Sequence, residues 1–291
     1  MIHSMTGYAA ASRDLGSAVM NLEIKSVNSR YLDVSFRLSE DLRFLEMPLR
    51  EKITERIGRG KIECRGYLQV QPAQGNAARE RKPNPALLVE LGQLDQAVRS
   101  TLPQAAPLSV AEVLRWPGVL GDDSLTAEQL QAAAQELFAT LLGEFIASRS
   151  REGAKLAEVL RERAARMRDL VRAAEPLLPV ALAAYRERLA SKLREAVANL
   201  DEERIRQEVG VFAAKIDVAE EIARLVTHLD ELERVLNKGG AVGKRLDFLM
   251  QELNREANTL SSKSVSAEVT AIALELKLLI EQMREQVQNL E

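Results

Sequence analysis

Apolar and polar side chains alternate along several short segments near the start of the chain, which is the pattern of strands with one buried face. The predicted strands are residues 4–12, 18–27, 31–38 and 62–70. Before the last of them, leucine and isoleucine recur every three or four residues, which predicts a helix over 41–57 that ends at Gly58. The order strand, strand, strand, helix, strand predicts a compact α+β domain at residues 1–72.

A change of composition follows this unit. Residues 71–85 read QPAQGNAARERKPNP, with three prolines, one glycine and very few apolar side chains. Proline and glycine in a polar stretch are typical of a linker or loop. We therefore place a domain boundary at 73–86 and a helical domain at 87–291.

The rest of the chain shows helical periodicity. Thr126 and Gln129 have the spacing of a capping box, which predicts a helix to Ala174, before two prolines. Further helices are predicted to about residue 200, over 202–236, and twice more after a glycine-rich turn at 237–243. The fold class is thus α+β, predominantly α, with a bundle of long helices. An apolar row in the last helix could pack within this bundle, which we favour, or against a second subunit; it comprises Val265, Val269, Ile272, Leu276, Leu279, Met283 and Leu290.

The composition of the chain excludes several kinds of binding site. The net charge of −3 gives no overall attraction for polyanions, so a nucleic-acid site would have to be a local basic patch. Cys64 is the single cysteine, which excludes an internal disulfide and zinc sites built on paired cysteines. No segment approaches the ~20 apolar residues of a membrane span. We expect a cytoplasmic protein that does not bind a membrane.

Few catalytic motifs are available. The only histidines are His3 and His228, and no GxSxG motif is present. The segment Gly239–Lys244 resembles a phosphate-binding loop, but its spacing is one residue short and Arg245 replaces the required serine or threonine. We therefore expect no nucleotide cofactor, and carboxylate chemistry with one histidine remains.

The predicted helix 202–236 carries a first candidate site. With a rotation of ~100° per residue, Asp217, Glu221, Arg224 and His228 share a sector opposite the apolar row, and Glu220 borders that sector. The row expected to be buried is Ile205, Val209, Phe212, Ile216, Ala219, Ala223 and Val226. A solvated helix face with charge pairs would look similar. The imidazole of His228 favours a divalent-cation site instead. Imidazole and carboxylate groups together can bind a cation, whereas a solvated helix face gains nothing particular from a histidine.

The segment Gly243–Lys263 is the second candidate. Glu252 and Glu256 share one polar sector close to the apolar side, while Asn254 and Asn258 lie in another. Asparagine is unfavourable inside a helix, so its repeated use indicates a role beyond helix stability. Hydrogen bonds between helices of the bundle are the alternative.

Basic residues gather in the first domain. From Arg50 to Arg65 there are six basic and three acidic residues, so the local excess is moderate. The candidates for nucleic-acid binding are Arg30, Arg37, Arg59 and Lys61. A solubilising surface is the alternative. Trp116, in a Trp-Pro-Gly turn, is predicted to be a core residue.

Several ordered segments together resemble the YicC family of bacterial proteins. These are Ser4–Tyr8, Val27–Asp33, Arg59–Lys61, Arg115–Gly118, Asp217–His228, Gly243–Phe248, Gln251–Glu256, Asn258–Leu260, Ser262–Ser264 and Glu281–Gln286. The resemblance covers nearly the whole chain. It implies a cytoplasmic endoribonuclease that needs a divalent metal, assembles as a homohexamer and encloses RNA within its subunits.

The catalytic roles are a hypothesis from the residues themselves. Carboxylates of Glu220, Glu221, Glu252 and Glu256 would hold Mn²⁺ or Mg²⁺. His228 would be a ligand or proton carrier, and Glu252 would also serve catalysis. Arg224 and Arg255 would neutralise charge in the transition state, with Arg30, Arg37, Arg59 and Lys61 on the RNA backbone. The alternatives are a non-catalytic RNA-binding adaptor that presents RNA to another nuclease, and a purely structural oligomer.

Overall fold

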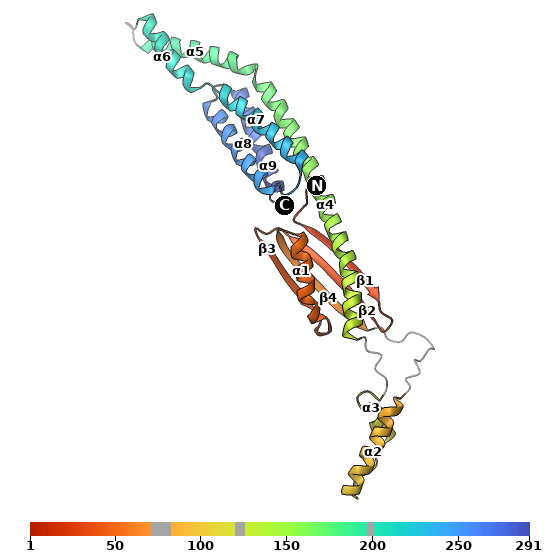
Figure 1. Cartoon of the computed structure of the whole chain (residues 1–291). Helices are drawn as coiled ribbons and strands as arrows, with labels where there is room; N and C mark the ends of the chain where they lie inside the picture. The colour runs from red at the N-terminus through yellow and green to blue at the C-terminus, as the bar shows by residue number, and fades with distance from the viewer. Residues whose placement is uncertain (71–82, 120–125, 197–200) are drawn as a thin grey trace.

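The structure is a computed structural model that describes residues 1–70, 83–119, 126–196 and 201–291. It confirms the α+β, predominantly α, fold class, with a small sheet and long helices (Figure 1). The predicted linker at 73–86 falls largely outside the described residues. None of the helices within these ranges is long and apolar enough to cross a membrane.

The sheet has the order β1-β2-β4-β3. Its strands are β1 (Gly7–Asp14), β2 (Ala18–Val27), β3 (Leu32–Leu38) and β4 (Gly60–Val70). The β1–β2 and β2–β4 pairs are antiparallel, whereas β3 and β4 are parallel and are joined through a helical crossover. This crossover contains η1 (Glu40–Leu45) and α1 (Glu46–Arg56) rather than one helix, because Pro48 cannot donate a backbone hydrogen bond and fits only the first turn of a helix.

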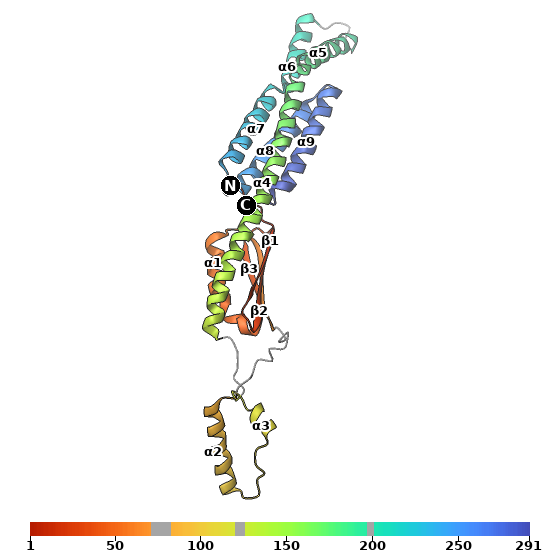
Figure 2. The same cartoon turned by 90° about the vertical axis from the view of Figure 1, so that its right-hand side faces the viewer.

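A long helix, α4 (Ala127–Ala174), links the two cores of the molecule. Thr126 begins it with the predicted capping box. Its first half packs with α1 on one face of the sheet, and its side chains from Leu130 to Phe145 complete that core (Figure 2). Its second half, from Ala157 to Ala174, packs into the helical bundle. The sheet core therefore extends into the segment that the sequence analysis assigned to the helical domain.

The bundle combines α4 with three helices of the last part of the chain. These are α7 (Ala219–Lys238), α8 (Gly243–Lys263) and α9 (Ala267–Val287). The apolar row of α9 is buried here, since Val269, Leu276 and Met283 are all inaccessible to solvent. The intramolecular packing favoured from the sequence is confirmed. At the far end of the bundle from the sheet, α5 (Leu177–Ala196) and α6 (Glu202–Lys215) form a hairpin (Figure 1).

Two helices, α2 (Pro85–Thr101) and the short α3 (Val110–Arg115), contribute to neither core. Trp116 follows α3 and is 47% exposed, so the prediction of a core tryptophan is wrong. The turn Trp116–Gly118 packs only locally, with Gly118 beside Leu87 of α2. Neither hydrophobic core extends to α2 and α3, so Trp116 has no core to pack into.

The predicted helix 202–236 is also wrong, because α6 ends at Lys215 and α7 begins at Ala219. The Asp217 carboxylate accepts a hydrogen bond from the Ala219 backbone N–H at 3.0 Å and starts the new helix. Aspartate competes with helical hydrogen bonding in this way. The break changes the helical phase of α7, so Val226, expected to be buried, is 36% exposed. Phe212, in the last turn of α6 and also expected to be buried, is 40% exposed.

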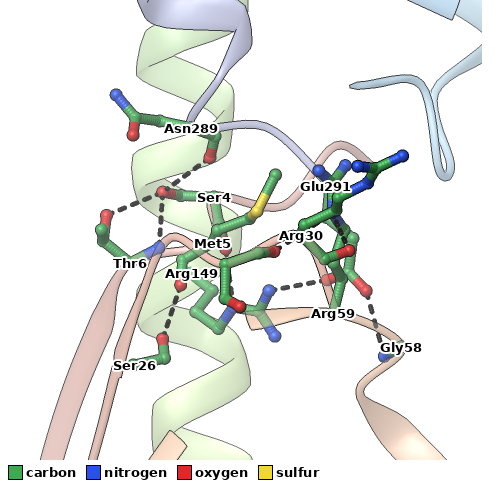
Figure 3. Close-up of polar contacts among 11 residues, drawn as sticks. Ser4, Met5, Thr6, Ser26, Arg30, Gly58, Arg59, Arg149, Asn289 and Glu291 are labelled. Carbon is green, nitrogen blue, oxygen red and sulfur yellow. Dashed lines mark hydrogen bonds and ion pairs between the residues drawn. The ribbon is translucent and has the colours of Figure 1, made fainter. Parts of the chain in front are cut away.

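The N-terminal segment and the end of the chain meet between the two cores (Figure 3). Ser4 and Leu290 form an antiparallel bridge, and the Met5 N–H donates to the Asn289 carbonyl oxygen at 2.7 Å. The guanidinium of Arg149, 3% exposed, donates to the Ser4 carbonyl oxygen and to the Glu291 carboxylate, both at 2.6 Å. These contacts join the sheet to the bundle.

Candidate functional site

The antiparallel helices α7 and α8 face each other with a row of polar pairs along one edge of the bundle. α7 buries its own apolar face through Ile222, Leu225 and Leu229, which brings the neighbouring polar positions to the rim of the core. Across the helix pair, the ion pairs are Glu221–Lys263 at 2.8 Å, Arg224–Glu256 at 3.5 Å and Glu231–Arg245 at 3.2 Å.

In the middle of this row, His228 faces two carboxylates, Glu252 and Glu256. One ligand atom of each of these residues lies within 4.8 Å of the other two. The three come from helical positions one turn apart: Glu252 and Glu256 on α8, with His228 opposite them on α7. His228 and Glu252 are half-buried, and Glu256 is 3% exposed.

This arrangement fits a divalent cation. Ligand atoms around Mg²⁺ at ~2.1 Å stand about 3 Å apart, so small side-chain rotations would bring the three groups into coordination. One imidazole with two carboxylates suits Mn²⁺ and related ions. A buried carboxylate also needs a positive partner, because desolvation penalises an isolated charge heavily.

Arg224 is the cation beside the cluster, and it is shared. One terminal nitrogen contacts Glu256 and the other contacts Glu220. The charge of Glu220, followed by that of Glu256, raises the pKa of the Arg224 guanidinium above its ordinary value. A single half-exposed arginine thus serves two carboxylates while Glu252 adds a third, which leaves the cluster attractive to a further cation.

The other predicted ligands lie outside the cluster. Glu220 is exposed and reaches Glu256 through Arg224. Glu221 is buried and accepts from the Lys263 ammonium, while its other carboxylate oxygen has no hydrogen-bond partner within the described ranges. The expectation that Glu221 and His228 face away from the core is wrong, because both lie at its edge. Arg255, three residues after Glu252, is exposed on α8.

A groove of about 870 Å³ lies between the sheet domain and the bundle. Two of its lining residues, Arg30 and Arg59, are predicted binding residues (Figure 3). Arg59 is held in place by its side-chain Nε–H, which donates to the backbone carbonyls of Ser29 and Arg30 at 3.2 and 3.1 Å. Lys244 and Arg284 line the same groove, although no pattern in the sequence pointed to them as binding residues.

Arg37 and Lys61 lie elsewhere, on the exposed face of the sheet opposite α1 and α4. Arg37 pairs with Glu63 at 3.2 Å. A hydrogen bond from Arg65, together with bonding from Lys25, holds the pKa of the Glu63 carboxyl below its ordinary value. The positive charge on this face is therefore partly neutralised.

Cys64 can be set aside as a nucleophile. It is fully buried in the sheet core, and this burial raises the pKa of its thiol to about 12. A thiol with this pKa is protonated at neutral pH, and a protonated thiol is unreactive.

Sequence comparisons place these residues in a known family. The model described as "Endoribonuclease YicC-like, N-terminal region" matches residues 2–158, and "Endoribonuclease YicC-like, C-terminal" matches 174–291. The chain belongs to the YicC-like endoribonuclease family. This confirms the resemblance. The interval between the two matched regions, residues 159–173, lies within α4, and no boundary between the models falls at the predicted linker 73–86.

Two full-length relatives agree with this assignment. "Probable endoribonuclease YicC" of Haemophilus influenzae is 45% identical over 296 residues, and both chains are covered completely. The protein of the same name from Clostridioides difficile is 28% identical over 300 residues, again with both chains covered completely. These two relatives therefore align with the whole length of this chain, including α7 and α8.

Proposed function

We propose that the protein is an endoribonuclease that cleaves RNA phosphodiester bonds with a divalent cation, Mn²⁺ or Mg²⁺. The observation that carries this proposal is the convergence of His228, Glu252 and Glu256 beside Arg224. The names of the relatives support RNA as the substrate. A metal-dependent endoribonuclease needs negative groups to hold a cation and positive groups to hold phosphate, and this chain has both beside one another.

His228, Glu252 and Glu256 are the proposed ligands. When bound, the cation would polarise the scissile phosphate and lower the pKa of the nucleophilic oxygen. Glu256 is the fixed member because it is buried, whereas the half-buried His228 and Glu252 can adjust to the ion. Of the four carboxylates considered from the sequence, Glu220 and Glu221 have other partners, and this geometry favours Glu252 and Glu256.

The arginines have separate roles in this proposal. Arg224 contacts Glu256 and is half-exposed, so the same guanidinium can position the carboxylate and donate to a phosphate oxygen. Arg255 is exposed on α8, three residues after Glu252, and would contact the RNA strand. Arg30 and Arg59 would bind the RNA backbone in the groove, and Arg37 and Lys61 would do so on the sheet face.

The homohexamer and the cytoplasmic location stay predictions. The apolar row of α9 is used within the bundle, so it no longer argues for a subunit contact. Native mass spectrometry of the purified protein, with and without RNA, measures the number of subunits directly.

The test is cleavage of a structured RNA by the metal-free protein after Mn²⁺ is restored, with chelator as the comparison. Glu252→Gln and His228→Ala should each reduce cleavage by at least ~100-fold, because each removes a ligand. Glu208→Gln, which changes an exposed carboxylate on α6, is the control and should cleave normally.

The contrary outcomes are distinct. Cleavage that continues in chelator, or that survives both ligand substitutions, would refute the proposed site. RNA binding without cleavage in any metal would favour the adaptor. The absence of salt-dependent RNA binding would favour the structural oligomer.

A further inference from the structure

One line of side chains on α8 connects the groove to the His228 cluster. Lys244, Phe248, Glu252 and Glu256 follow one another at four-residue intervals. Each interval advances ~6 Å along the helix axis and rotates the side chain by only ~40°. Lys244 lines the groove and Glu252 belongs to the cluster, so Phe248 lies between them, about one helical turn from each.

Phe248 differs from the apolar residues around it. The other large apolar side chains of α8, such as Leu249 and Met250, are fully buried, whereas Phe248 is 48% exposed. The Arg245 guanidinium carbon lies 5.7 Å from the centre of its ring. An exposed aromatic ring beside a cation is the type of surface on which single-stranded nucleic-acid binders stack bases.

The groove at the other end of this line is rich in positive charge. Four cationic side chains, Arg30, Arg59, Lys244 and Arg284, line it together with one carboxylate, Asp247. They come from four separate parts of the chain: the loops before β3 and β4, and the helices α8 and α9. Several cations that converge on one cavity can each bind a different phosphate. The groove is therefore better suited to a polyanionic backbone than to a ligand with one acidic group.

We propose that this surface is a track for single-stranded RNA, with phosphates in the groove and one unpaired base stacked on Phe248. The strand would then continue along α8 to Glu252, ~12 Å from Lys244 along the axis. A duplex keeps its bases stacked internally, so an exposed ring selects an unpaired nucleotide. This inference rests on the proposed function for its substrate, and it adds the strand form and the binding residues.

The test measures binding of the full-length protein to a fluorescent 12-nucleotide RNA in chelator, where cleavage does not interfere, and to the same RNA annealed to its complement. Phe248→Ala should weaken single-strand binding by about 5- to 150-fold, the range of one lost stacking contact, and should affect duplex binding less. Phe248→Tyr should restore binding. Leu274→Ala, at an exposed leucine of α9, is the apolar control.

The double variant Lys244→Ala/Arg284→Ala tests the groove. Removing two phosphate contacts should lower the slope of log affinity against log salt by about 1.4, at ~0.7 per contact for single strands. Arg188→Ala/Lys192→Ala removes two exposed cations from α5, at the far end of the bundle, and should leave the slope unchanged. Melting temperatures establish that each variant is folded.

The outcomes separate this inference from the proposed function. Unchanged RNA affinity in folded Phe248→Ala, or a change in subunit number alone, would overturn the track even if the protein cleaves RNA with metal. Conversely, binding that depends on Phe248 and Lys244 in a protein that never cleaves would support the track and refute the nuclease.

Discussion

Arg224 on α7 and Glu256 on α8 form an ion pair in which one partner is half-exposed and the other is 3% exposed. The nitrogen–oxygen distance of 3.5 Å is long for a charge-assisted hydrogen bond, which is usually below 3 Å. The buried carboxylate is therefore only partly compensated by its arginine.

Loss of Arg224 should leave Glu256 buried without its cation. We expect Arg224→Ala to lower the free energy of unfolding, though by less than the loss of one partner of a fully buried pair, because Arg224 is half-exposed. Mn²⁺ should raise the melting temperature of this variant more than that of the wild type. Thermal unfolding in chelator and in excess Mn²⁺ measures both effects, and an equal metal response in the two proteins would contradict the shared site.

The junction between sheet and bundle should depend on Arg149. Its guanidinium is buried and bonds both Ser4 and Glu291, so Arg149→Met should cost about 3 kcal/mol by leaving the Glu291 carboxylate without its cation. Arg151→Ala, at an exposed position of the same helix, is the matched control. Urea unfolding should separate the two variants clearly, and equal midpoints would show that this ion pair does not stabilise the junction.

Two glycines of α4 should respond to alanine in opposite directions. A Cβ at Gly153 would lie 2.3 Å from the Ile2 carbonyl oxygen, whereas a Cβ at Gly143 would meet nothing within 4 Å. We expect Gly153→Ala to destabilise the protein by more than ~1 kcal/mol and Gly143→Ala to stabilise it by up to ~1 kcal/mol. Opposite shifts in melting temperature are the expected result. A stabilising Gly153→Ala would mean that the N-terminal segment does not lie against α4.

His3 should give the folded protein a pH dependence below neutrality. Burial, followed by the charge of Arg149, lowers the pKa of the His3 imidazole from its ordinary 6.5. The unfolded chain then binds the proton first, so this contribution to stability is present above pH ~6.5 and declines as the pH falls below that value. The loss of unfolding free energy between pH 7.5 and 5 should be smaller in His3→Gln, and equal losses in the two proteins would contradict it.

The positions of helices and strands could be predicted from the sequence better than the exposure of the side chains on them. Alternation in 18–27 and three- to four-residue spacing in 41–57 depend on local burial, and both elements are present apart from the start of the helix. The polar sector containing Glu221 and His228 depended on one unbroken helix. The short break between Lys215 and Ala219, where the Asp217 carboxylate accepts from the Ala219 N–H, resets the phase, and no periodicity reveals such a break.

The residues of the candidate site could be predicted from the sequence in part, but their arrangement could not. His228, Glu252 and Glu256 stood out as an isolated imidazole and paired carboxylates, and the packing of α7 on α8 brings them together. The groove was harder to predict because its cations come from elements more than 200 residues apart in the chain, from Arg30 to Arg284. Their proximity depends on the junction, not on any local pattern.

The metal site can be tested with crystals of the protein soaked in Mn²⁺. We expect an anomalous-scattering peak ~2 Å from an imidazole nitrogen of His228 and from a carboxylate oxygen each of Glu252 and Glu256, absent in His228→Ala crystals soaked in the same way. A soaked wild-type crystal with no peak between these three side chains, or with its manganese at Glu220 and Glu221 instead, would contradict it.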